Sequence, residues 1–174
     1  MPYEEVTRTA EEEVCMDKST EEEAVIVHRA TIADVEKMHE LINVFAQKGL
    51  MLPRSRNQFY QDIRDFFVAE KGGEFAGCGA LHVTWSDLCE VRSLAVVEKF
   101  QGNGVGHHIV KRLLEDAHAL KLPRVFALTY QRAFFESLGF VEIDKDDLPH
   151  KVWGECINCP KFPNCDETAV VLDL

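Results

Sequence analysis

Long apolar runs and clusters of positive charge are both absent from this chain of 174 residues. No apolar stretch approaches the ~20 residues of a membrane-spanning helix, and the N-terminus lacks the basic-then-apolar order of a secretion signal. The chain has 19 Lys and Arg against 30 Asp and Glu, a net charge of −11, and no basic face that could neutralise phosphates. The sequence therefore predicts a cytoplasmic protein that binds neither a membrane nor a nucleic acid.

The negative charge is concentrated in residues 1–23, which contain nine acids and two basic residues. This segment has few large apolar side chains, so it predicts a disordered acidic tail, either a solvated extension or a tail that binds a partner. The chain is 46% hydrophobic, enough for the core of one domain. We expect that domain over residues 24–145, and a Cys-rich segment over 146–174 that ends in a strand of the same domain.

Short patterns along residues 24–145 predict an alternation of helices and strands. Thr31 and Asp34 form a capping-box pair before one apolar-periodic segment, and Ser55 and Gln58 form another before a second segment. Gly72-Gly73 between two apolar runs indicates a hairpin. The predicted order is strand, two helices, three strands, helix, strand, helix, strand. In the second helix, Phe59, Ile63 and Phe66 are expected on one buried stripe.

The segment from Glu90 to Leu114 carries the strongest chemical signal. An apolar strand, EVRSLAVV, is followed by QGNGVG and then by a helix with apolar residues at a spacing of three to four. Glycines let backbone N–H groups approach a ligand closely, and a helix N-terminus favours an anion. This order predicts a phosphate-binding loop.

Two common kinds of phosphate loop do not match. A nucleoside-triphosphate P-loop closes with Lys and Ser or Thr, whereas His107 and His108 stand here. A dinucleotide-binding loop belongs to an early strand–helix unit, with an acid at the end of the next strand. This loop instead follows three antiparallel-looking strands, and the next strand ends in Leu128-Thr129-Tyr130.

A third kind does match: Gln101-x-x-Gly104-x-Gly106 resembles the acetyl-CoA signature of the GNAT superfamily of N-acetyltransferases. Residues 133–140, AFFESLGF, resemble the second element of that family, and the likeness covers residues 24–145. It implies an α/β fold: a mixed, mostly antiparallel sheet of about six to seven strands, splayed at the central strand and flanked by about four helices.

Three segments, QKGLMLPRSRNQFY, EVRSLAV and RVFALTYQRAFFESLGF, are similar to the N-acetylglutamate synthases, in particular to short bacterial forms without a kinase domain. That family transfers the acetyl group of acetyl-CoA to the amine of L-glutamate, the first step of arginine biosynthesis. The resemblance implies that acetyl-CoA lies against Leu94, Ala95, Val96, Gln101, Gly102, Asn103, Gly104, Val105, Gly106 and Phe134.

The resemblance also implies catalytic roles. Glu90, at the start of the central strand, would be the general base, although a carboxylate there is also typical of a surface position. The N–H of Leu94 would polarise the thioester oxygen. Many members use a Tyr as the acid where this chain has Phe135. Tyr130 is then the next donor, unless it only packs, or the thiolate leaves unassisted.

For the acceptor carboxylates, Arg54 matches the carboxylate-binding Arg of the family. Arg92 shares a strand face with Glu90 and either reaches the acceptor or neutralises that acid. Ser93 and His82 complete the expected acceptor site. Arg56 and Lys151 are weaker alternatives.

The C-terminal segment departs from the family, whose long forms complete the glutamate pocket with basic residues there. Cys156, Cys159 and Cys165, with His150 upstream, have the spacing of a structural zinc site, and a stiff reduced loop is the alternative. Cys15, Cys78 and Cys89 are expected to be ordinary thiols. A homodimer is left open.

Two other functions compete with glutamate acetylation. The altered C-terminal segment is compatible with another small acidic amine as the acceptor. A regulatory module that only binds CoA is the second alternative, and Glu90 argues against it because a binder needs no base.

Overall fold

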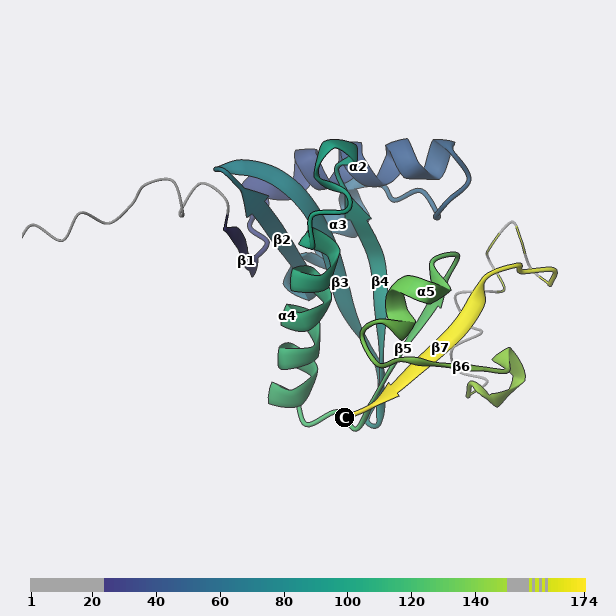
Figure 1. Ribbon diagram of the computed structural model, residues 1–174. Helices are drawn as coiled ribbons and strands as arrows, with labels where there is room; N and C mark the ends of the chain where they lie inside the picture. The colour runs from purple at the N-terminus through teal and green to yellow at the C-terminus, as the bar shows by residue number, and fades with distance from the viewer. Residues whose placement is uncertain (1–23, 150–156, 158, 160, 162) are drawn as a thin grey trace, which may run out of the picture.

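The computed structural model describes residues 24–149, 157, 159, 161 and 163–174 of the chain. One seven-stranded sheet runs through the molecule in the order β1-β2-β3-β4-β5-β7-β6 (Figure 1). Its strands are β1 (Val25–Arg29), β2 (Phe66–Lys71), β3 (Glu74–Trp85), β4 (Leu88–Val96), β5 (Arg124–Thr129), β6 (Val141–Ile143) and β7 (Thr168–Asp173). The α-helices of the described part are α2 (Val35–Gln47), α3 (Arg56–Gln61), α4 (Val105–Ala119) and α5 (Arg132–Glu136).

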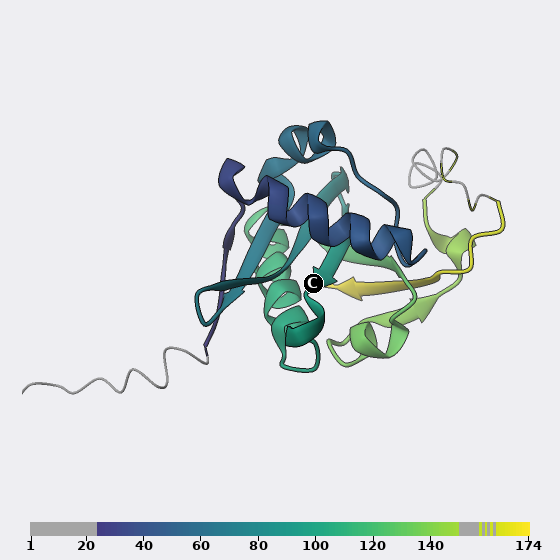
Figure 2. The ribbon, with the colours of Figure 1, turned by 90° about the horizontal axis from the view of Figure 1, so that it is seen from above.

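Helices cover both faces of the sheet, with α2 and α3 on one side and α4 on the other (Figure 2). Side chains of β2 alternate between the two cores, as a strand that is buried on both faces requires. Phe66 and Val68 pack with α2, whereas Phe67 and Ala69 pack with α4. The sheet is therefore the common wall of two apolar cores.

Neighbouring strands are antiparallel except for β4 and β5, which are parallel and connected through α4. The β4–β5 pairing includes only Cys89 with Val125 and Glu90 with Phe126. Beyond these pairs the two strands diverge, so the sheet is splayed at its centre. The architecture expected from the resemblance is confirmed in strand number, helix number and splay.

Both predicted capping boxes are present. Thr31 caps the 3₁₀ turn Ile32–Asp34 that leads into α2, and its backbone N–H donates to Asp34 Oδ2 at 2.8 Å. Ser55 caps α3 and accepts from the N–H of Gln58 at 3.3 Å. Each cap satisfies backbone donors that the first helical turn leaves without a partner.

The predicted extent of the second helix is wrong at its end. The structure ends α3 at Gln61, continues with a 3₁₀ turn at Ile63–Asp65, and begins β2 at Phe66. Phe59 and Phe66 are fully buried in the same core, with ring centroids 5.3 Å apart. The three-to-four spacing of Phe59, Ile63 and Phe66 suggested one helix, but α3 and the start of β2 both direct side chains into the same core.

Two glycines of β3 bring α4 close to the sheet. A Cβ on Gly79 would lie 2.9 Å from Ile109 Cγ2, and one on Gly77 would lie 2.6 Å from the Ala95 carbonyl oxygen. Any larger residue would push α4 or β4 away. These glycines thus fix where the N-terminal end of α4 stands relative to β4.

Cys78 and Cys89 are buried strand residues, and burial raises the pKa of each thiol to about 12. Because the thiolate is the reactive form, both should resist alkylation at pH 8 in the folded protein and react after denaturation. Peptide mapping after iodoacetamide treatment checks this. Labelling of either residue at the rate of a free thiol, without denaturant, would contradict their placement.

Among the described residues, no helix is both long enough and apolar enough to cross a membrane. The acidic tail predicted over residues 1–23 lies outside the described residues.

Candidate functional site

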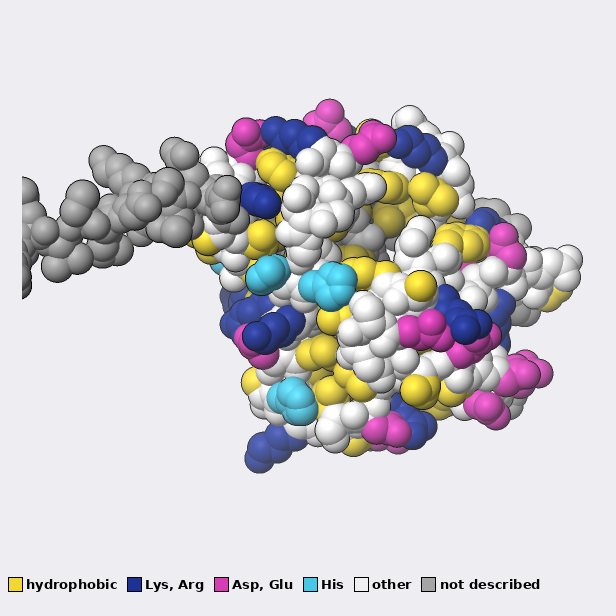
Figure 3. Space-filling view, in the orientation of Figure 1, with side chains coloured by type: hydrophobic (Ala, Val, Ile, Leu, Met, Phe, Trp, Pro, Cys, Tyr) yellow, Lys and Arg dark blue, Asp and Glu magenta, His cyan; other side chains and the backbone are white. Residues whose placement is uncertain are grey.

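A cavity of about 1390 Å³ opens where β4 and β5 diverge. Its lining comes from β4, the Gly-rich loop, the first turn of α4, the end of β5, the loop between α2 and α3, and the C-terminal segment. Figure 3 shows a hollow with hydrophobic side chains in its depth on the face that carries the N-terminal end of α4. One continuous space thus connects the predicted phosphate loop with the predicted acceptor residues.

A bulge in β4 shapes the middle of this cavity. Cys78 pairs with Ala95 and Ala80 with Arg92, so Ser93 and Leu94 both lie opposite the single residue Gly79. Ser93 has a φ of 54°, which is uncommon for a residue with a side chain. Bulges and backbone strain of this kind concentrate at functional sites, where they redirect backbone and side-chain groups. The bulge places the predicted oxyanion donor, Leu94, in the cavity lining.

The Gly-rich loop is held in shape by its own contacts. Gly104, the N-cap of α4, has a φ of 77° and accepts a hydrogen bond of 2.9 Å from His108 Nδ1. A Cβ on Gly106 would lie 3.1 Å from the ring of Phe134, which packs over the first turn of α4. The loop therefore needs glycine for conformation at one position and for space at the other, and it presents the start of a 15-residue helix to the cavity.

All the residues predicted to bind the cofactor lie in this region. Of the ten, the cavity lining includes Leu94, Ala95, Val96, Gln101, Gly102, Gly104, Val105, Gly106 and Phe134. Asn103 lies in the same loop, exposed, and its side-chain amide donates to the Gln101 carbonyl at 3.3 Å.

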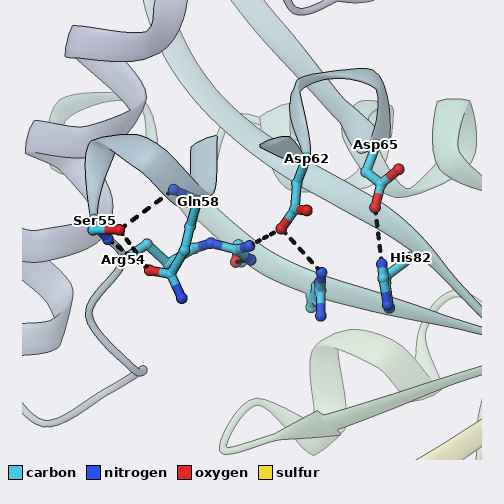
Figure 4. A network of polar contacts seen from close by, with 8 residues as sticks. Arg54, Ser55, Gln58, Asp62, Asp65 and His82 are labelled. Carbon is cyan, nitrogen blue, oxygen red and sulfur yellow. Dashed lines mark hydrogen bonds and ion pairs between the residues drawn. The ribbon is translucent and has the colours of Figure 1, made fainter. Parts of the chain in front are cut away.

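Arg54 and Arg92 meet at one carboxylate, which the sequence analysis did not identify. Both guanidinium groups contact Oδ2 of Asp62, and the Arg92 Nη2 distance is 3.3 Å. Figure 4 shows the side chain of Arg54 directed at Asp62. Arg54 also donates to Ser93 Oγ at 3.2 Å. Each arginine side chain is 12% exposed, so the pair is largely withdrawn from water. Two guanidinium groups therefore share one carboxylate oxygen in this corner of the cavity.

His82 and Glu90 face each other across the β3–β4 ladder and both line the cavity. His82 Nδ1 lies 2.9 Å from Asp65 Oδ2, as Figure 4 shows. Glu90 is half-buried at the last paired position before β4 and β5 diverge. A carboxylate is thereby placed at the base of the splay, below the bulge that carries Leu94.

Tyr130 follows β5 directly and lines the cavity, but its hydroxyl has partners elsewhere. It donates to Asp166 Oδ1 at 2.6 Å and accepts from Lys161 Nζ. Desolvation and the bond to Asp166 raise the pKa of this phenol, while Lys161 acts in the opposite direction. Tyr130 is therefore held in its protonated form, with the proton directed to Asp166.

The C-terminal segment contributes Cys159, Cys165 and Glu167 to the cavity lining. Of the predicted zinc ligands, Cys156 and His150 lie outside the described residues. The residues that the structure does describe form no group of three or more metal-binding side chains. Neither Glu167 nor Lys161 was singled out in the sequence, because no local pattern indicates that this segment returns to the cavity.

Comparisons with known proteins point to one family. Residues 35–140 match the model described as the acetyltransferase (GNAT) family. The chain is 38% identical over 148 residues to an uncharacterized N-acetyltransferase of Chlorobaculum tepidum, covering 85% of this chain and 96% of that one. It is 41% identical over 133 residues to an amino-acid acetyltransferase of Mycobacterium tuberculosis, covering 75% of this chain and 76% of that protein. It spans only 31% of the amino-acid acetyltransferase of Pseudomonas putida.

Solved structures show the same likeness. A Mycobacterium tuberculosis protein in complex with CoA and NLQ superposes with a TM-score of 0.76 at 36% identity, over 86% of this chain and 99% of that one. The N-acetylglutamate synthase of Neisseria gonorrhoeae, complexed with coenzyme A and N-acetyl-glutamate, gives a TM-score of 0.79 at 25% identity, over 87% of this chain and 35% of that one.

Proposed function

The chain belongs to the acetyltransferase (GNAT) family, and on that premise we propose that it transfers the acetyl group of acetyl-CoA to the α-amine of L-glutamate. The observation that carries the proposal is the single cavity that connects the Gly-rich loop, the β4 bulge and the Arg54–Asp62–Arg92 cluster. An anion-binding loop at one end suits the pyrophosphate of CoA. Two arginines at the other end suit a carboxylate.

In this proposal the diverging strands hold the thioester between them. The pantetheine arm lies against β4, and the N–H of Leu94 polarises the thioester oxygen as negative charge develops there. Arg54 and Arg92 bind a carboxylate of the acceptor, with Ser93 and His82 beside them. Holding both substrates in one cavity makes the attack effectively unimolecular, so no acyl-enzyme is needed.

Proton transfer completes the reaction. The acceptor amine reaches the site as an ammonium ion, and Glu90 takes its proton, directly or through water. The amine nitrogen then bonds to the thioester carbon, the C–S bond breaks to release the CoA thiolate, and the nitrogen loses its second proton to solvent as the amide forms. Tyr130 is the proposed proton donor to that thiolate. The alternative is protonation by solvent, and the bond from Tyr130 to Asp166 favours it.

A panel of amines with acetyl-CoA, monitored by release of the CoA thiol, tests the proposed function. We expect L-glutamate to give the highest kcat/KM. If the protein acetylates another small acidic amine and not L-glutamate, the proposed acceptor is wrong and the proposed acetyl transfer still holds. CoA binding without turnover of any amine would favour the regulatory module.

The Gly-rich loop gives a prediction for cofactor binding. Gly104→Ala places a side chain at a φ of 77°, which costs about 1 kcal/mol and distorts the first turn of α4. We expect the KM for acetyl-CoA to rise about tenfold and the KM for the acceptor to stay constant. The matched control is Gly73→Ala, which has the same strain (φ 73°) in the β2–β3 turn, away from the cavity. Equal kinetic effects of the two variants would contradict the role of the loop.

The zinc prediction remains to be tested. If Cys156, Cys159, Cys165 and His150 hold a structural zinc, purified protein contains one equivalent by elemental analysis, and a chelator lowers the melting temperature. Protein without stoichiometric metal would show that the segment is a reduced loop.

A further inference from the structure

Glu167 is a carboxylate in the cavity to which the proposed mechanism gives no task. It directly precedes β7, is half-buried, and lines the cavity beside Cys165. Oε2 accepts a hydrogen bond of 3.6 Å from the Cys165 thiol, a weak donor. Among the described residues, no Lys, Arg or His nitrogen lies within 4.0 Å of the Glu167 carboxylate, so Glu167 forms no ion pair there. The side chain therefore retains free acceptor capacity that faces the cavity.

The nearest lysines bind other groups. Lys145 Nζ donates to the Cys165 carbonyl at 2.6 Å. Lys161 Nζ contacts the Tyr130 hydroxyl, the Gly49 carbonyl at 3.4 Å and Asp166 at 3.5 Å. These contacts fasten the C-terminal segment to the end of β5 and to the turn after α2. They position Glu167 in the wall of the cavity without neutralising it.

A half-buried carboxylate without a counter-ion has a free-energy cost. Glu167 is half-buried in the cavity wall, and Lys145 and Lys161 contact other groups rather than its carboxylate. A ligand that brings a positive charge into the cavity would offset that cost.

We propose that Glu167 binds the ammonium group of the acceptor and is therefore a substrate-binding residue of this site. The proposal rests on the proposed function, since it assumes an amine acceptor. An α-amino acid carries a carboxylate and an ammonium group. The Arg54–Asp62–Arg92 cluster offers guanidinium donors to the first, and Glu167 offers a carboxylate to the second. Glu90 keeps its proposed role as the base that takes a proton from the amine, directly or through water.

The test is Glu167→Gln, which keeps the size of the side chain and removes its charge. With L-glutamate as the probe, we expect the acceptor KM to rise about tenfold or more, as the loss of one charge-assisted hydrogen bond predicts. The KM for acetyl-CoA and kcat should stay within about twofold, because binding rather than chemistry is lost. The melting temperature should stay constant or rise, because a desolvated charge has been removed. A purely structural role predicts a lower melting temperature instead.

Glu142→Gln is the matched control. It removes a carboxylate of the same length on β6 that pairs with Arg132 and does not line the cavity, so the acceptor KM should not change. An unchanged acceptor KM in Glu167→Gln would overturn the proposal. If the wild type uses another amine of the panel, the glutamate assignment fails, and the same comparison with that amine still decides the role of Glu167. If no amine of the panel is acetylated, both proposals fail.

Discussion

Glu90→Gln should lower kcat by a factor on the order of 10² to 10⁴ while both KM values stay within about threefold. Gln keeps the size of the side chain, and an amide cannot accept the proton that the attacking amine must lose. Glu90 stands at the last paired position of β4 and β5, below the splay that would hold the thioester. Steady-state kinetics with acetyl-CoA and L-glutamate at saturating concentrations measure the effect.

The control for this variant is Glu70→Gln on β2. Glu70 is also a half-buried strand glutamate near a histidine, at 3.9 Å from His28, but it lies outside the cavity lining. Its substitution should leave kcat unchanged. A Glu90→Gln enzyme with the kcat of the wild type would show that another group, or solvent, takes the proton.

Arg54→Met should raise the acceptor KM about 100-fold, which corresponds to ~2.7 kcal/mol, with little change in the KM for acetyl-CoA. The side chain is only 12% exposed, so water cannot replace its contacts with the acceptor. Arg54→Lys keeps the charge but loses the planar fork, and an intermediate KM is expected. Initial rates over a wide range of acceptor concentration distinguish the three enzymes.

Arg29→Met provides the comparison. Arg29 also pairs with an aspartate, Asp116, and lies over a phenylalanine, with its guanidinium carbon 4.7 Å from the Phe67 ring centroid. Arg54 lies 5.5 Å from the Phe66 ring centroid in the same way. Both substitutions should cost stability, but only Arg54→Met should change the acceptor KM. If the acceptor KM rose equally in Arg54→Met and Arg29→Met, Arg54 would have a structural role and not a role in acceptor binding.

The fold and the phosphate loop could be predicted from the sequence because their causes are local. A capping pair such as Ser55 and Gln58 lies within one turn, and the strand–QGNGVG–helix order lies within 25 residues. The predicted helix end at Phe66 was wrong for a physical reason. The spacing of apolar residues indicates which side chains are buried in one core, but it does not indicate whether a helix or a strand carries them.

The acceptor end could be predicted only in part. Arg54 and Arg92 were identified singly, but their meeting at Asp62 depends on the loop after α2, the end of α3 and β4 coming together. The positive φ of Ser93 follows from a bulge opposite Gly79, which one strand alone does not encode. Likewise, the contact of Lys161 with Tyr130 joins residues 31 positions apart. Long-range pairings of this kind leave no periodic signal in the sequence.

The measurement that tests the central claim most directly is product identification by mass spectrometry after the purified protein is incubated with acetyl-CoA and L-glutamate. We predict N-acetyl-L-glutamate in one-to-one proportion with released CoA, and about one hundredth as much product or less with the Glu90→Gln enzyme over the same time. CoA release without N-acetyl-L-glutamate, or no release above the rate of thioester hydrolysis, would contradict the account.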